Sequence, residues 1–86
     1  MRLDKYLKVS RLIKRRTLAK EVAESERIYV NNQIAKPSKE LHIGDTITIE
    51  FGSKRVTVKV TSLEPTTKKS EATSLYEFVS EEKKSI

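Results

Sequence analysis

The apolar positions at the start of the chain recur at the spacing of a helix. They are Leu3, Tyr6, Leu7 and Ile13. The segment 3–13 is therefore predicted to be an amphipathic helix that buries this stripe. Asp4 is expected to be its N-cap, because a carboxylate there accepts hydrogen bonds from backbone N–H groups one turn on. At this spacing Tyr6 is more typical of a core residue than of a platform for stacked bases.

A second helical pattern runs from Thr17 to Glu24. Thr17 is a favourable N-cap residue, and we expect it to cap the helix rather than to contact a ligand. The apolar face of this helix is formed by Leu18, Ala19, Val22 and Ala23. Arg15 and Arg16 stand at its start, where the helix dipole also favours anions. This arrangement suits a phosphate group.

After residue 27 the pattern changes to an alternation, which is typical of strands. Ile28–Val30 is predicted to be a strand and Asn31-Asn32 a tight turn, because asparagine tolerates positive φ. Gln33–Ala35 is then expected to return antiparallel to the first strand. Lys36-Pro37-Ser38 breaks the pairing, and a loop leads to a turn at Gly44-Asp45.

Two later segments alternate clearly enough to be predicted as strands. The first, 46–51, places Ile47, Ile49 and Phe51 on one face. The second, 55–63, places Val56, Val58 and Val60 on one face, with Thr57, Lys59 and Thr61 on the other. Gly52-Ser53 is expected to connect them, and Pro65 to end the second strand.

The residues after Pro65 carry a weaker pattern. Lys68–Leu75 is predicted to be a short helix, followed by an extended piece at Tyr76 and Phe78, and Ser80–Ile86 is expected to be frayed. The sequence thus predicts an α+β fold in which two N-terminal helices pack on a small antiparallel sheet. We expect one domain over residues 1–65 and a C-terminal tail over residues 66–86.

Positive charge is concentrated at the start of the chain. The whole sequence of 86 residues has a formal net charge of +6. The first twenty residues hold eight Lys or Arg against one acid, whereas the other sixty-six hold ten Lys or Arg and eleven acids. Such a concentration is an electrostatic footprint for a polyanion. The candidate residues for binding such a polyanion are Arg2, Asp4, Lys5, Lys8, Arg11, Lys14, Arg15, Arg16, Thr17 and Lys20.

Several other classes of protein are disfavoured. The chain has no cysteine, which excludes a disulfide scaffold and a zinc site that needs thiolates. Its single histidine, His42, has no obvious nucleophile or metal-ligand partner, and no Gly-rich phosphate loop or catalytic triad spacing is present. We therefore expect no enzyme activity, no metal and no cofactor. No long apolar run suggests a secretory signal or a membrane span, so a soluble, cytoplasmic protein is expected.

Three short pieces of the sequence together resemble the S-four RNA-binding domain. They are Arg2-Leu3-Asp4-Lys5-x-Leu7, Arg15-Arg16-Thr17-x-Ala19 and Arg27-Ile28-x-Val30-Asn31. Lys36-Pro37-Ser38 and Gly44-Asp45 match the later loop and turn of that domain, so the resemblance covers residues 2–51. No single piece is diagnostic, but their order and spacing together are specific. The resemblance implies the S-four (alpha-L) fold and binding to structured RNA.

The tail narrows this resemblance to stand-alone S-four proteins of the ribosome. Ser70-Glu71-Ala72 and Leu75-Tyr76-Glu77 are similar to those of ribosome-associated quality-control factors and of ribosome-associated heat-shock proteins. The first type is favoured, because the heat-shock members continue into a longer charged extension. The resemblance implies binding to large ribosomal subunits obstructed by peptidyl-tRNA, through rRNA and the P-site tRNA. It further implies support for alanine tailing of the stalled chain by a separate tRNA-delivering factor.

The sequence departs from the S-four pattern at three positions. Glu26 replaces a usual glycine where the second helix must end, which is expected to cost about 1 kcal/mol if φ is positive there. Asn32 replaces a frequent glycine in the hairpin, and Arg15 replaces a frequent serine, which adds charge to the basic face.

Alternatives remain open at this point. A heat-shock-type factor that rescues or recycles blocked subunits keeps the partner and changes the role. A helix-turn-helix DNA-binding protein is disfavoured, because the second helix offers only Lys20, Glu21 and Glu24 for base readout. A membrane-surface helix would need a large exposed apolar face, which the packing on the core uses. Asp4 can form a simple ion pair with Arg2 or Arg16, or it can orient an arginine toward phosphate. A monomer is expected.

Overall fold

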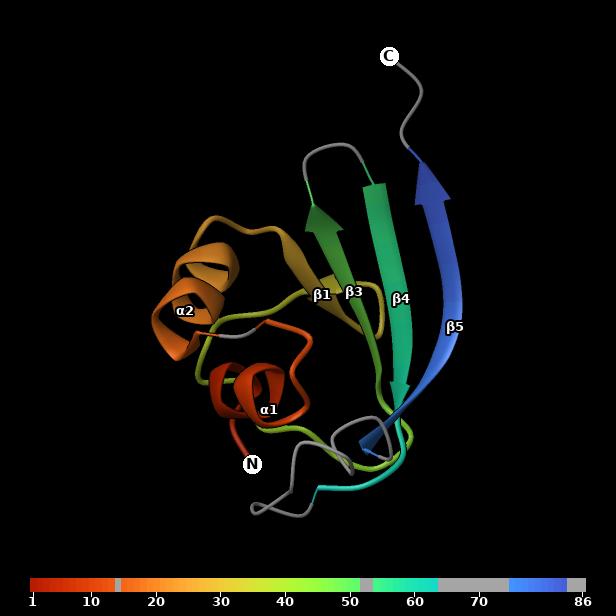
Figure 1. Ribbon diagram of the computed structural model, residues 1–86. Coiled ribbons are helices and arrows are strands. Elements are labelled where there is room, and N and C mark those ends of the chain that lie inside the picture. The colour runs from red at the N-terminus through yellow and green to blue at the C-terminus, as the bar shows by residue number, and fades with distance from the viewer. Residues whose placement is uncertain (14, 52–53, 64–74, 84–86) are drawn as a thin grey trace.

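The computed structural model describes residues 1–13, 15–51, 54–63 and 75–83, without the side chain of residue 16. Within these ranges the chain forms two helices that lie on one face of an antiparallel sheet (Figure 1). The helices are α1 (Leu3–Val9) and α2 (Arg16–Glu24). The strands are β1 (Ile28–Val30), β2 (Gln33–Ile34), β3 (Thr46–Phe51), β4 (Lys54–Val60) and β5 (Tyr76–Lys83). Their order across the sheet is β2-β1-β3-β4-β5, which confirms the predicted α+β class.

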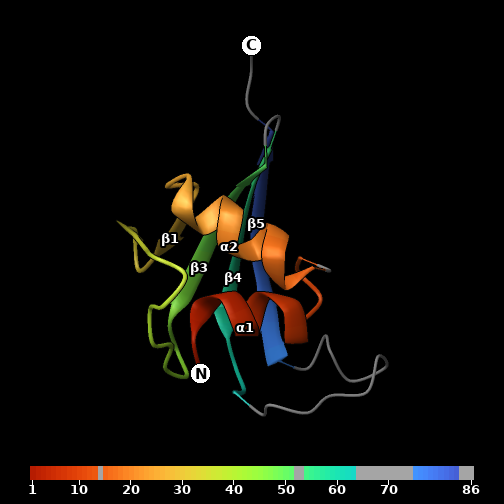
Figure 2. The same ribbon diagram turned by 90° about the vertical axis from the view of Figure 1, so that its left-hand side faces the viewer.

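The core lies between the two helices and the face of the sheet that they cover. In Figure 2 both helices lie in front of the sheet. The alternation of the strands places their apolar residues toward the helices. The largest fully buried side chains of the helices and strands are Leu3, Tyr6, Leu7, Ile28, Ile47, Ile49, Val58 and Val60. Neither helix is long and apolar enough, within the described residues, to cross a membrane.

Tyr6 is a core residue, as its spacing predicts. Its side chain is fully buried, and its hydroxyl donates a hydrogen bond to the backbone carbonyl of Leu75 just before β5. Burial, with a smaller contribution from the nearby Tyr76, raises the pKa of the Tyr6 phenol well above its ordinary range. The ring therefore joins α1 to the C-terminal strand and does not form a platform for bases.

The start of α1 differs from the prediction that Asp4 caps it. Asp4 is the second residue of the helix and is buried, and its Oδ1 accepts a hydrogen bond from the Lys5 N–H at 2.9 Å. Backbone carbonyls from a distant loop satisfy the first amides instead. The Leu3 N–H donates to the Lys39 carbonyl at 2.8 Å, and the Asp4 N–H donates to the Pro37 carbonyl at 3.1 Å. A tertiary contact has taken the place of the side-chain cap.

The end of α1 also differs from the prediction, because the helix stops at Val9 rather than at residue 13. Arg11 has a φ of 63°, which no α-helix can continue. The turn that follows is closed by a hydrogen bond from the Ile13 N–H to the Leu7 carbonyl at 3.0 Å. It brings Ile13 into the core, with 4% of its surface exposed.

The prediction that Thr17 caps α2 is wrong. The helix begins at Arg16, the preceding Arg15 makes no side-chain capping hydrogen bond, and Thr17 is exposed inside the first turn. The predicted apolar face is only partly buried: Ala19 and Ala23 lie in the core, whereas Leu18 is 47% exposed. The helix thus turns Ala19 and Ala23, not Leu18, toward the core.

The end of α2 contains one of the three departures from the S-four pattern, Glu26. Glu26 has a φ of 61°, so the usual glycine would fit its backbone better. The Glu26 N–H donates to the Ala23 carbonyl at 3.1 Å, and the Arg27 N–H donates to the Val22 carbonyl at 3.3 Å. This pair of bonds is the usual way a helix ends at a left-handed residue.

The predicted hairpin is present. Asn31 and Asn32 have φ values of 53° and 66°, and the register pairs Tyr29 with Ile34 and Val30 with Gln33. β3 pairs with β1 on the other side, with Ile28 opposite Ile49. The Asn31 side chain reinforces this junction, since its oxygen accepts a hydrogen bond from the Thr46 N–H at 3.1 Å.

The C-terminal segment is more ordered than expected. β5 runs antiparallel to β4 through Lys83, so the prediction of a frayed end is wrong for residues 80–83. A register shift opposite Thr57 and Val58 keeps the strand paired, and Lys54 and Glu81 form an ion pair at 3.2 Å. The predicted helix at 68–75 lies outside the described residues except for Leu75, which is buried.

We predict that Glu26→Gly raises the free energy of unfolding by about 0.5–1 kcal/mol, because glycine adopts positive φ without the steric cost that a side chain carries there. Urea denaturation of the two proteins measures the difference. Glu26→Ala is the matched control, since it removes the charge and keeps the backbone cost. An equal gain from the alanine variant would contradict the backbone explanation.

We predict that Tyr6→Phe lowers the free energy of unfolding by about 1 kcal/mol at neutral pH, the usual net contribution of one buried hydrogen bond. The Leu75 carbonyl keeps partners in the variant, because it also accepts from the N–H groups of Thr61 and Ser62.

The same pair of proteins tests the raised pKa of Tyr6. An unfolded tyrosine ionises near pH 10, whereas the folded phenol stays protonated to higher pH, so ionisation favours unfolding above that point. The advantage of the wild type over Tyr6→Phe should therefore be complete below about pH 10 and shrink above it. Urea denaturation at pH 8 and pH 11 measures this change, and an undiminished advantage at pH 11 would contradict it.

Candidate nucleic-acid interface

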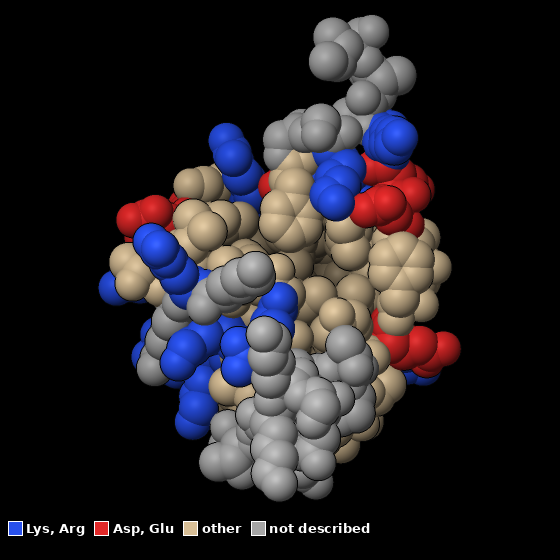
Figure 3. Space-filling model, viewed as in Figure 1, with Lys and Arg blue, Asp and Glu red and all other residues tan. Residues whose placement is uncertain are grey.

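The side chains predicted to bind RNA are largely exposed on the two helices and on the turn between them. Arg2, Lys5, Lys8, Arg11, Arg15, Thr17 and Lys20 are exposed, and Asp4 is buried. Lys14 and the side chain of Arg16 lie outside the described residues. In Figure 3 the Lys and Arg side chains gather over the helices. We call the described exposed cations Arg2, Lys5, Lys8, Arg11, Arg15 and Lys20 the basic face.

The strands carry charges of both signs. β5 exposes Glu77, Glu81 and Glu82 together with Lys83, and Glu81 pairs with Lys54 of β4 at 3.2 Å. In Figure 3 Lys and Arg side chains lie among the acids on that side, whereas cations predominate over the helices. A polyanion is therefore attracted to the helices more than to the mixed charges of the strands.

Asp4 holds Arg2 on the basic face. The Arg2 Nε lies 3.3 Å from Asp4 Oδ1, and the Asp4 side chain is 4% exposed while that of Arg2 is 48% exposed. The backbone of Arg2 also bridges to Glu40. A buried carboxylate therefore fixes a guanidinium that stays open to solvent, which fits a positioning role for Asp4. Direct contact of either residue with phosphate stays a prediction.

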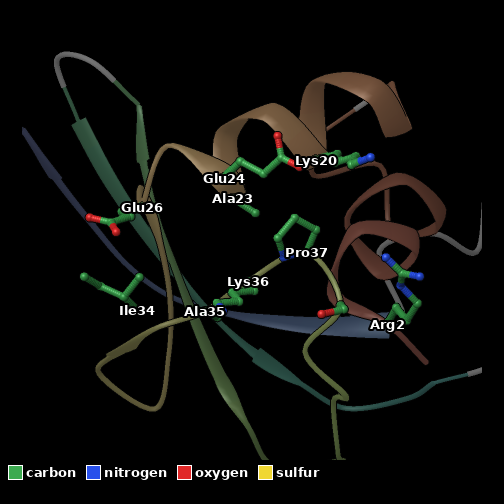
Figure 4. A pocket seen from close by; sticks show the side chains of 10 residues that line it. Arg2, Lys20, Ala23, Glu24, Glu26, Ile34, Ala35, Lys36 and Pro37 are labelled. Carbon is green, nitrogen blue, oxygen red and sulfur yellow. The ribbon is translucent and has the colours of Figure 1, made fainter.

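A cleft lies between the basic face and the loop that caps α1 (Figure 4). It has a volume of about 420 Å³ and is bordered by Arg2, Lys20 and Lys36, with Pro37 in its middle and Glu24 on its rim. Arg2 and Lys36 come from segments far apart in the sequence.

Lys36 is a candidate that the sequence analysis missed. The backbone bonds from Leu3 and Asp4 to the loop carbonyls place it on the border of the same cleft as Arg2, with Pro37 between them. Its only signal was the match of Lys36-Pro37-Ser38 to a loop of the S-four domain, which identifies a conformation and not a ligand contact. Lys39, exposed in the same loop, adds a further positive charge nearby.

His42 lies at the turn before β3. It is 80% exposed, and its backbone N–H donates to Asp45 Oδ2 at 2.9 Å. Although burial acts in the other direction, this bond and one from the Asn31 side chain hold the pKa of Asp45 below its ordinary value. The carboxylate braces the turn before β3. No group of three potential metal ligands occurs in the part of the chain that the structure describes.

The two helices on an antiparallel sheet and the basic face match the predicted S-four RNA-binding domain. Comparison with known families agrees with this assignment. The model of the S4 domain, the family called S-four above, matches residues 1–47. The chain belongs to the S4 domain family.

Particular members are also similar over nearly the whole chain. The chain is 59% identical over 83 residues to the RQC P-site tRNA stabilizing factor of Bacillus subtilis, covering 96% of each protein. It is 56% identical over 81 residues to the protein of that name from Streptococcus pneumoniae, covering 94% of this chain and 92% of the relative.

Heat shock proteins are more distant relatives. Identity to Heat shock protein 15 of Escherichia coli K12 is 39% over 82 residues, which span 94% of this chain but 62% of that protein. The trimeric structure of Vibrio cholerae Heat Shock Protein 15 superposes with a TM-score of 0.84 at 35% identity, covering 92% of this chain and 81% of that one. These matches support the predicted resemblance to both types of stand-alone protein.

We predict that Lys20→Ala and Lys36→Ala each reduce the salt dependence of RNA binding. The slope of log affinity against log salt should become less steep by about one for each phosphate contact that is lost. Fluorescence anisotropy with a structured RNA across a salt series measures this slope.

Lys59→Ala is the matched control, because Lys59 is exposed on β4 between the inward-facing Val58 and Val60 and so points away from the helices. Its slope should equal that of the wild type. Equal slopes for all three variants would show that neither the basic face nor the cleft is the binding site.

Proposed function

We propose that this protein is a non-enzymatic RNA-binding factor of ribosome-associated quality control. It binds large ribosomal subunits obstructed by peptidyl-tRNA, contacts rRNA and the P-site tRNA, and holds the tRNA in place. It acts as a monomer in the cytoplasm. The observation that carries the proposal is the basic face, on a chain 59% identical to a factor whose name is RQC P-site tRNA stabilizing factor.

The basic face supports recognition of structured RNA by its backbone. Double-stranded RNA is read largely through phosphates and 2′-hydroxyl groups, because its deep groove excludes side chains. The exposed groups of the face are cationic, and the nearby aromatic ring of Tyr6 is buried and engaged with Leu75. Such a surface follows the shape of an RNA helix or a tRNA without reading base edges.

Stabilisation of a tRNA follows from several weak contacts made at once. Each exposed cation contributes a modest, screened interaction, but cations fixed on two packed helices act together. The buried Asp4 and the loop that caps α1 limit the movement of Arg2, which lowers the entropy lost on binding. This rigidity supports a positioning role beside a separate factor that delivers alanyl-tRNA for tailing.

We expect the double variant Arg2→Ala, Arg16→Ala to lose binding to large subunits that carry peptidyl-tRNA. A charge-assisted hydrogen bond contributes roughly 1.5–3 kcal/mol, so the affinity should fall by at least about tenfold. Co-sedimentation of tagged protein measures it, with Lys59→Ala as the control. Normal binding by the double variant would refute the assignment of the site.

The role in tailing is tested in cells that lack the protein. Alanine tails on stalled chains should fall, and the wild-type gene but not the double variant should restore them. The similarity to Heat shock protein 15 favours a second candidate, the rescue or recycling of blocked subunits. Persistence of normal tails in the deletion strain, with blocked subunits accumulating, would favour that candidate instead.

A further inference from the structure

A second hollow lies beside the basic face, on the other side of α2 from the cleft. It has a volume of about 520 Å³ and is formed where the turn after α1, the helix α2 and the end of β3 meet. Its walls are Leu12, Leu18, Val22 and Phe51. In Figure 3 a hollow of uncharged side chains lies between the Lys and Arg side chains over the helices and the acids on the other side.

The exposure of Leu18 is the unusual feature of this hollow. Leu18 is 47% exposed, although the next residue of α2, Ala19, is fully buried. Phe51, at the end of β3, is only partly buried, and the Lys54 Nζ lies 5.9 Å from the centre of its ring. Leu18 and Phe51 thus stay partly exposed to water next to the basic face. Neighbouring exposed apolar side chains of this kind often mark a binding site.

The rim of the hollow is positively charged. Arg15 and Arg27 line it and are both exposed. Glu50 also lines it, but its Oε1 accepts a hydrogen bond from Arg55 Nη2 at 2.6 Å, so its charge is already balanced. An occupant that matches this surface has a flat apolar body and negative charge on either side. An unpaired nucleotide has both, since its base has two apolar faces and its phosphates flank it.

We propose that this hollow seats the base of an unpaired RNA nucleotide, with the phosphates beside it held by Arg15 and Arg27. The inference rests on the proposed function, because the basic face must first bring RNA to the protein. It adds a preference that the basic face alone does not provide. The protein should bind a helix with a bulged or looped-out nucleotide more tightly than a fully paired helix.

Three RNA hairpins of one sequence test this preference by fluorescence anisotropy. One is fully paired, the second carries a single bulged adenosine, and the third carries an abasic residue at the bulge. Stacking of one base on a protein side chain typically raises affinity by about tenfold or more. The wild type should bind the adenosine bulge about tenfold more tightly than the paired hairpin. The abasic hairpin should lose that gain. Equal affinity for the adenosine and abasic bulges would overturn the proposal.

Leu18→Ala identifies the hollow as the seat of the base. It should remove the preference for the adenosine bulge and keep the affinity for the paired hairpin. Ile43→Ala is the matched control, because Ile43 is 67% exposed and lies outside the hollow. Thermal unfolding confirms that both variants are folded. An equal loss for all three hairpins in Leu18→Ala would overturn the proposal.

Binding to large subunits separates this inference from the proposed function. If the wild type pellets with large subunits but does not distinguish the hairpins, the base seat is refuted and the proposed function stands. If Leu18→Ala also fails to pellet in that case, the hollow contacts the subunit without selecting an unpaired base, which likewise refutes the base seat. If the wild type binds neither the hairpins nor the subunits, both proposals fail.

Discussion

The first turn of α1 is capped by the backbone of a loop more than thirty residues away. The Leu3 and Asp4 amides donate to the carbonyls of Lys39 and Pro37, and the Leu41 N–H donates to the Met1 carbonyl. An α-helix of seven residues is too short to be stable alone, so α1 depends on this contact and on its buried face. The contact sets the position of Arg2, places Lys36 on the border of the same cleft, and leaves the carboxylate of Asp4 to hold a guanidinium. The basic face and the cleft both depend on it.

The sheet was predictable because its physical cause is local. Ile47 and Ile49 in β3, and Val58 and Val60 in β4, alternate with polar residues, and this alternation specifies which face is buried. Two successive asparagines specify the hairpin. The helix ends were not predictable in the same way. Asp4 and Thr17 are good capping residues, but the loop backbone caps α1, and the left-handed conformation of Arg11 ends it early. Contacts distant in sequence decided these points. In the tail, Tyr76 and Phe78 fitted strand spacing, but nothing local indicated that pairing would continue to Lys83.

Some residues of the candidate site were predictable from the sequence, and others were not. The concentration of charge in the first twenty residues was enough to predict the exposed cations of the basic face. It could not indicate Lys36, because that residue reaches the site only through the folding of its loop. Helical spacing predicts Leu18 to lie on the buried face of α2, but the structure leaves it 47% exposed. A periodic pattern shows which residues share a face of a helix, but it does not show how far that face turns toward the sheet.

The concentration of positive charge on the helices, set against the mixed charges of the strands, gives the molecule an electric dipole, which acts before any contact forms. In the field of an RNA surface the protein experiences a torque that turns the helices toward the phosphates and the sheet away from them. Fewer encounters are then lost to wrong orientations, and the association rate rises without any change in the bound state. The uneven placement of charge thus orients the protein while it approaches a surface covered with phosphates.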